Sequence, residues 1–169
     1  MYQYSKRPYS YLAVGFLGVA LFLLQFNNIL PTIGSAYPVL LLPFVLYCGA
    51  YFGAFSGVLT GAITGMAMDI YTGGSPSFHM VMFCIIGCAS GFFITYYLNR
   101  NWQALTILTL SLCLFYYFVK WLCFYNQPGG FVSYFLTTGI LSALYTAILG
   151  LPIYLLISWV LRLVENGEK

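Results

Sequence analysis

A row of small residues between positions 49 and 73 limits what this chain can fold into. The row repeats every four residues and comprises Gly49, Gly53, Gly57, Gly61, Gly65, Asp69 and Gly73. On a helix, residues four apart lie nearly above one another, so these positions form a groove without side chains. Each interior glycine costs a water-soluble helix roughly 1 kcal/mol relative to alanine, whereas in lipid small residues at this spacing let two helices approach closely. The row therefore predicts a packing seam or a docking groove for a partner's helix.

The composition indicates that this seam lies in a membrane. Of the 169 residues, 62% are hydrophobic and 5% are charged, and the mean hydropathy is +0.89, whereas a soluble domain has about 25% charged residues. The apolar runs leave room for about six crossings of roughly 20 residues and for no separate aqueous domain. We expect an all-α, polytopic membrane protein with one integral domain, 1–169, a basic arm, 1–9, and a polar tail, 164–169.

Apolar runs and turn residues predict where the helices lie. The 34 residues from Pro38 to Tyr71 would form a helix of roughly 51 Å, too long for a hydrocarbon core of about 30 Å. A turn near residues 49–53 should divide them into a helix that contains Pro43 and a glycine-rich helix, and whether the first of these spans fully stays open. Pro152 predicts a kink or tilt in the last helix. The remaining helices are expected at about residues 11–30, 75–98, 103–125 and 131–163.

The distribution of cations indicates the orientation in the membrane. The net charge of +3 is too small and too scattered to suggest nucleic-acid binding. With six helices, Lys120 lies towards one side and five cations lie on the other, so the positive-inside rule places both termini in the cytoplasm. Those five are Lys6, Arg7, Arg100, Arg162 and Lys169. A signal peptide is the competing interpretation of the amino end, but more apolar helices follow, which favours an uncleaved span.

A few polar residues stand within the apolar runs. Asp69 is the only acidic one, and an ionisable group inside a membrane is by default a functional or pairing site. His79 and Lys120 are expected at a similar depth on the next two helices, which predicts an outer-end cluster of Asp69, His79 and Lys120. A satisfied ion pair or helix-end hydrogen bond, contact with a partner, and proton or substrate handling all stay open as its role. Gln25 should lie near the outer surface or face protein, because lipid would penalise its amide.

The sequence offers little for catalysis or for metal binding. It lacks the zinc-protease, nucleophile-elbow and phosphate-loop motifs, so we expect no enzyme, no cofactor and no metal. The five cysteines lie in apolar runs and should be small buried hydrophobes; they are Cys48, Cys84, Cys88, Cys113 and Cys123. Cys84 and Cys88 share a helix face that could in principle bind a soft metal, but a single pair of cysteines is weak evidence for a metal site.

Residues 49–92 resemble the rod shape-determining protein MreD family. Its members carry a glycine-spaced helix that ends in an acidic residue, then a short turn with glycine and a second glycine-bearing helix. The basic amino end, the aromatic fifth helix and the final SALYTAILGLPIYLLISWVLR also look like that family, so the resemblance covers nearly the whole chain. The turn at residues 74–77 departs from the longer apolar lead of many relatives. The pattern falls here on Gly53, Gly57, Gly61, Gly65, Asp69, Gly73, Gly87 and Gly91.

The resemblance implies a non-enzymatic subunit of the bacterial cell-elongation machinery in the cytoplasmic membrane. Its partners would be the bitopic protein MreC, the actin-like MreB and the peptidoglycan synthases, beside membrane lipid. The family's architecture also looks like the substrate-binding subunits of energy-coupling-factor vitamin transporters, which supply the alternative function. Such a subunit needs a pocket with convergent polar groups, and none is evident here, so the sequence favours the scaffold. Its partner or packing groove would comprise Gly53, Gly57, Gly61, Gly65, Gly87 and Gly91.

Overall fold

The computed structural model describes residues 8–27, 37–73, 77–96, 102–124 and 134–166. These residues form six α-helices and one π-helical turn, and none of them lies in a strand. The expectation of an all-α protein is confirmed. The elements are α1 (Pro8–Phe26), α2 (Leu41–Phe52), α3 (Ala54–Thr72), α4 (Phe78–Tyr96), α5 (Trp102–Phe124), η1 (Phe135–Gly139) and α7 (Ile140–Asn166).

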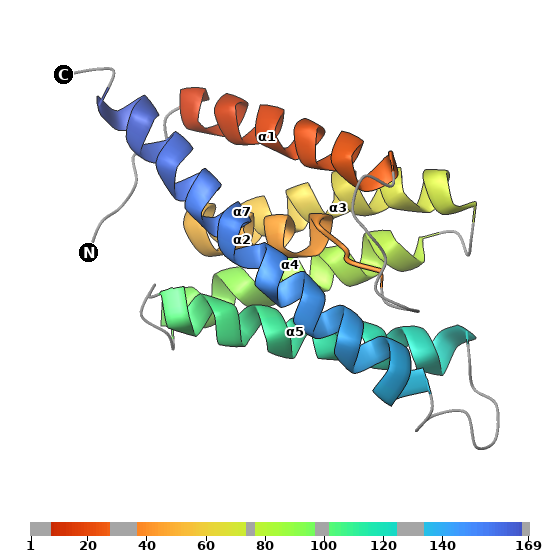
Figure 1. Ribbon diagram of the computed structural model, residues 1–169. Helices are drawn as coiled ribbons and strands as arrows, with labels where there is room; N and C mark the ends of the chain where they lie inside the picture. Colours follow the sequence, from red (N-terminus) through yellow and green to blue (C-terminus); the bar gives the residue numbers. More distant parts are fainter. Residues whose placement is uncertain (1–7, 28–36, 74–76, 97–101, 125–133, 167–169) are drawn as a thin grey trace.

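The short helix α2 lies at the centre of the bundle (Figure 1). Every residue from Leu41 to Ala50 is buried, and α2 contacts each of the other five α-helices. Its 12 residues rise roughly 18 Å, which is less than a hydrocarbon core of about 30 Å. Helix α2 is therefore an enclosed core helix that does not cross a membrane by itself.

Four of the described helices are long and apolar enough to cross a membrane, namely α1, α4, α5 and α7. Helix α3 has 19 residues, but its glycines, its hydroxyl side chains and Asp69 make it less apolar than these four. The membrane character expected from the composition is thus carried by α1, α4, α5 and α7. The short helix α2 lies among the other helices, whereas the glycine-rich α3 lies at the edge of the bundle, with large apolar side chains such as Ile63 exposed.

The turn that divides the long apolar run falls on Gly53. Helix α2 ends at Phe52 and α3 begins at Ala54, as the sequence predicted for residues 49–53. Gly53 has a φ of 97°, a backbone conformation that residues with a Cβ rarely adopt. The glycine row is consequently shared between two helices, because Gly49 belongs to α2.

Helices α3 and α4 pack backbone against backbone along the glycines. A Cβ added at Gly61 would lie 2.6 Å from the carbonyl carbon of Phe83, and one added at Gly65 would lie 2.5 Å from the Cα of Met80. From the other side, a Cβ added at Gly87 would lie 3.0 Å from the Cα of Gly57. Only glycine permits this approach, which makes α3 and α4 the most extensive helix pair in the described part of the chain.

Helix α7 runs obliquely across the bundle and contacts α1, α2 and α5 (Figure 1). Pro152 lies inside it, and the π-helical turn η1 precedes it directly. Helix α1 begins at Pro8 within the expected arm, and α7 extends to Asn166 within the expected tail. Lys6, Arg7, Arg100 and Lys169, and the turn residues 74–76, lie outside the described residues.

The cysteines differ in their surroundings. Cys48 and Cys113 are buried, as expected, and Cys84 is partly buried, but Cys88 and Cys123 are exposed. Burial was the wrong expectation for Cys88 and Cys123, because a weakly polar thiol on a membrane helix can face lipid as readily as protein. The described residues contain no group of three or more metal-ligating His, Cys, Asp or Glu residues, so Cys84 and Cys88 have no third ligand among them.

The seam between α3 and α4 predicts that Gly61→Ala is destabilising and Gly15→Ala is not. A methyl at Gly61 would meet the backbone of α4, whereas nothing lies within 4 Å of a Cβ added at Gly15. Overpacking of this kind costs about 1–3 kcal/mol, which should lower the Tm by roughly 2–12 °C for a domain of this size. Thermal unfolding of both variants in mild detergent measures the difference, and equal Tm values would contradict the backbone contact.

Candidate functional site

Asp69 joins the end of α3 to the beginning of α4. Its carboxylate accepts the backbone N–H groups of His79 and Met80, each at 3.0 Å. The Nδ1 of His79 lies 2.7 Å from the Oδ1 of Asp69 and donates to it, because an ionised carboxylate can only accept. The first N–H groups of a helix lack partners within it, and the positive end of the helix dipole favours an anion there. Asp69 therefore caps α4 from the neighbouring helix.

The beginning of α2 is capped in the same way, by side chains of α1 and α7. The Leu40 N–H donates to the Oε1 of Gln25 at 2.7 Å, and the Val39 N–H donates to the Oγ1 of Thr146 at 3.2 Å. Gln25 also donates through Nε2 to the carbonyl of Pro38 at 3.0 Å. Unsatisfied backbone groups are costly in hydrocarbon, and these contacts remove that cost for an enclosed helix. The expectation that Gln25 faces protein is confirmed.

Lys120 lies near the pair formed by Asp69 and His79 but outside it. Its Nζ lies 5.9 Å from the centroid of the Tyr116 ring, within the range of a cation–π contact. Lys120 and His79 line one cavity, whereas among the described residues no ion pair joins Lys120 to Asp69. The expected cluster of three is thus divided into a bonded pair, Asp69 and His79, and a lysine on the cavity wall.

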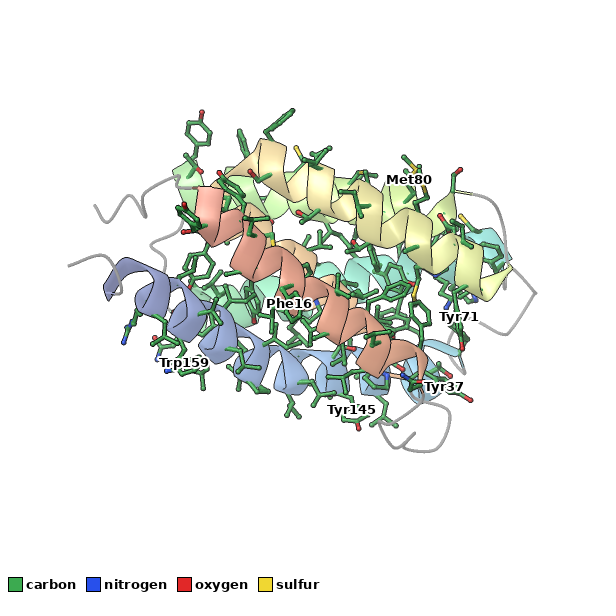
Figure 2. The ribbon with its side chains drawn as sticks, turned by 90° about the horizontal axis from the view of Figure 1, so that it is seen from above. Phe16, Tyr37, Tyr71, Met80, Tyr145 and Trp159 are labelled. Atoms are coloured by element: carbon green, nitrogen blue, oxygen red, sulfur yellow. The ribbon has the colours of Figure 1, made fainter. Side chains whose placement is uncertain are left out.

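That cavity has a volume of about 640 Å³ and takes its walls from α1, α3, α4, α5, η1, the start of α7 and residues 37–39, which precede α2. Tyr37 and Tyr71, two of its residues, lie at one end of the bundle (Figure 2). Polar side chains line this cavity, so the expectation that the chain has no polar pocket is wrong. The sequence did not reveal the pocket because these residues come from five separate stretches of the chain. Polar and aromatic side chains of its lining include Gln25, Tyr37, Tyr71, Phe78, His79, Tyr116, Tyr117, Lys120, Phe124, Tyr134 and Ser142.

Five of the six glycines of the expected groove face other parts of this chain, whereas nothing lies within 4 Å of a Cβ added at Gly53. Gly57, Gly61 and Gly65 face α4, and a Cβ added at Gly91 would lie 2.8 Å from the carbonyl carbon of Gly53. A partner's helix has no room on these glycines while α4 covers them. Of the two uses expected for the row, the structure places internal packing there.

An open apolar groove lies between α1 and α3, with α2 as its floor. It has a volume of about 490 Å³, and Figure 2 looks onto this face, with α1 between α3 and α7. Gly15 and Gly18 of α1 line one wall, Leu59 and Ile63 of α3 line the other, and Phe44 lies between them. The wall on α3 belongs to the side of the helix that does not contact α4.

A family model matches most of the chain. It is described as rod shape-determining protein MreD and covers residues 7–160. The chain belongs to the MreD family. A search of curated proteins and a search of solved structures give no match, so the likeness to energy-coupling-factor subunits stays an expectation. Membership in the MreD family gives this membrane protein a role in determining rod shape, and the matched range includes both capped helices and the cavity.

The structure of this MreD protein brings together several residues that the sequence did not indicate. Tyr116, Tyr134 and Ser142 line the cavity, and Thr146 caps α2. A signal for Tyr116 existed in the aromatic outer end of the fifth apolar run. No sequence pattern indicated Tyr134 and Ser142. The π-helical turn η1 between them determines which side chains face the cavity, and the position of such a turn cannot be predicted from hydropathy.

The cap on α4 predicts that Asp69→Ala lowers stability and that Asp69→Asn lowers it less. Alanine removes an ionised acceptor of two backbone N–H groups, a loss of about 1.5–3 kcal/mol, whereas asparagine keeps one acceptor oxygen. Thr95→Ala is the matched control, because Thr95 donates only within α4, to Gly91 at 2.6 Å. If Thr95→Ala and Asp69→Ala unfold at the same temperature, the cap does not hold α4.

Proposed function

We propose that this MreD protein is a non-catalytic scaffold of the bacterial cell-elongation complex and that it binds the single membrane helix of an MreC-like partner. The family match over residues 7–160 is the observation that carries the proposal. Capture of a helix needs an apolar surface and no reactive group, and the one acidic side chain described inside the bundle, Asp69, is committed to α4. An MreB-like filament and the peptidoglycan synthases are the further partners that the family resemblance implies.

The arrangement of the chain ends supports cytoplasmic termini. The first turn of α1 and the last turn of α7 lie at the same end of the bundle (Figure 1). Arg162 belongs to that last part of α7, whereas Lys120 lies on the wall of the cavity, near the other end of the bundle. With the cations of the amino end and of the tail, the positive-inside rule orients the end that carries Arg162 towards the cytoplasm.

The groove between α1 and α3 is the proposed place of the partner's helix. Its walls run from Tyr11 to Phe22 on α1 and from Ser56 to Ala67 on α3, about 12 residues each, or roughly 18 Å. Gly15 leaves an opening in the α1 wall, since no atom lies within 4 Å of a Cβ added there. Small residues let a second helix approach the backbone and gain dispersion contacts that lipid tails provide less well.

One observation favours the alternative function, a substrate-binding subunit of an energy-coupling-factor vitamin transporter. The cavity of about 640 Å³ falls within the roughly 300–1,000 Å³ of small-molecule sites. The family match favours the scaffold, since the matched family is named for shape determination. Co-purification with an MreC-like protein, beside a mass-spectrometric search for a bound vitamin, decides between the two.

The proposed docking groove predicts that Gly15→Trp abolishes capture of the partner while the fold is kept. The indole would fill the groove, which is open at Gly15, and would exclude the partner's helix. Ile148→Trp is the matched control, because it adds the same side chain at a position that is 64% exposed on α7. Co-purification of each variant with a tagged, co-expressed MreC-like protein measures the effect.

The expected result is at least a tenfold loss of partner for Gly15→Trp, which is roughly 1.4 kcal/mol, and wild-type yield for Ile148→Trp. Size-exclusion profiles of the two variants alone show whether the bundle is intact. Wild-type capture by Gly15→Trp would place the partner elsewhere on the protein. Loss of capture in both variants would show that any added bulk on the lipid face is harmful and would remove the groove's special role.

A further inference from the structure

We infer that the cavity lined by Lys120 is a binding site for a molecule that joins an anionic group, a carboxylate or a phosphate, to a flat apolar body. The inference concerns the other end of the bundle from Arg162 and a different surface from the groove between α1 and α3. It therefore holds or fails independently of partner capture.

The first observation that supports this inference is that Lys120 has no anionic partner among the described residues. Lys120 is partly buried on α5, and its Nζ lies over the Tyr116 ring at 5.9 Å. No ion pair to Lys120 exists among the described residues. A charge removed from water is costly unless it is paired, and the aromatic face offsets only part of that cost. The ammonium group is thus available to an anion that enters the cavity.

The nearest acidic side chain does not fill this role. Asp69 accepts the N–H groups of His79 and Met80 and the Nδ1–H of His79. These three bonds commit the carboxylate to the beginning of α4. They also fix the His79 ring, whose Nε2 takes no part in the bond to Asp69 and belongs to a side chain on the cavity wall.

The second support is a buried hydroxyl without a partner. Tyr116 lines the cavity and is fully buried, yet its hydroxyl makes no hydrogen bond among the described residues. Buried polar groups in native structures are nearly always paired, so an exception calls for a missing partner. An anionic group between Lys120 and Tyr116 would accept hydrogen bonds from both.

The third support is the shape of the walls. Aromatic side chains of α1, α3, α4 and α5 line the cavity, and among them are Tyr71, Phe78, Tyr117 and Phe124. Such walls favour a flat ring or sugar face over a flexible chain, because aromatic side chains add stacking to area burial. The π-helical turn η1 contributes to the same wall between Tyr134 and Ser142, and such turns are frequent at functional sites.

Two classes of ligand could carry an anionic group beside a ring or sugar body. One is a water-soluble carboxylate or phosphate that enters from the aqueous side. The other is an anionic lipid whose headgroup reaches the cavity from the adjacent leaflet. The experiment below has one arm for each source.

Phenyl phosphate is the soluble probe, added to the protein in a non-ionic detergent while the Tm is followed. A ligand that binds only the folded protein raises the Tm in a concentration-dependent way. Benzyl alcohol, which has the ring without the anion, and inorganic phosphate, which has the anion without the ring, are the comparison compounds. In the lipid arm, the protein is placed in phosphatidylcholine nanodiscs with and without phosphatidylinositol, whose anionic phosphate carries a sugar-like ring.

The variants are Lys120→Met, Tyr116→Phe and Arg162→Met. Lys120→Met should weaken binding of phenyl phosphate by about tenfold or more, the loss that accompanies removal of one charged hydrogen bond. Tyr116→Phe should weaken it less and leave the Tm without probe unchanged or higher, because it removes an unpaired hydroxyl. Arg162→Met removes a cation far from the cavity and should bind as the wild type does.

Stabilisation by phenyl phosphate that depends on Lys120 supports the proposal with a soluble ligand. Stabilisation by phosphatidylinositol alone, again dependent on Lys120, supports it with a lipid headgroup whose phosphate carries a ring. Three results overturn it: no stabilisation in either arm, equal stabilisation of Lys120→Met and wild type, or equal effects of benzyl alcohol and phenyl phosphate. If Lys120→Met does not fold, Tyr116→Phe carries the test, and unweakened binding by that variant overturns the proposal.

Discussion

The backbone contact between α3 and α4 is the interaction on which the other helices depend. In lipid, an apolar side chain gains little by leaving hydrocarbon for protein, so close approach of backbones has to supply the dispersion energy. Gly57, Gly61 and Gly65 permit that approach on α3, and Gly87 permits it on α4. Asp69 then fixes the longitudinal register of the pair, because its carboxylate must meet the first turn of α4.

A short helix can occupy the centre of this bundle because the backbone N–H groups at its amino end are satisfied by other helices. Helix α2 lacks the length to reach water on both sides, yet the N–H groups of the two residues that lead into it, at positions 39 and 40, donate to Thr146 and Gln25. At its other end, the Gly53 N–H donates to the carbonyl of Gly49 at 2.9 Å. The same physical rule thus governs α2 and α4: a helix that begins inside the protein takes its cap from another helix.

The polar groups near the cavity end of the bundle are of two kinds: some make hydrogen bonds to backbone groups, and others have no hydrogen-bond or ion-pair partner among the described residues. Asp69 and Gln25 are engaged with backbone groups, which is a structural role. Lys120 and the Tyr116 hydroxyl have no such partner among the described residues. In a medium where unpaired polar groups are costly, that difference distinguishes the proposed ligand site from the polar side chains that support the fold.

The sequence by itself determined the membrane class, the all-α fold, the break near Gly53 and the proximity of Asp69 to His79. Each follows from a local pattern: hydropathy, glycine spacing, or two residues on either side of one short turn. Only the tertiary structure decided that α4 covers the glycine row, that Lys120 stands apart from Asp69, and that Gln25, Tyr116 and Ser142 belong to one end of the bundle. These facts depend on which faces of distant helices meet. The sequence does not indicate those faces, because a helix that is hydrophobic all round has no distinct apolar face.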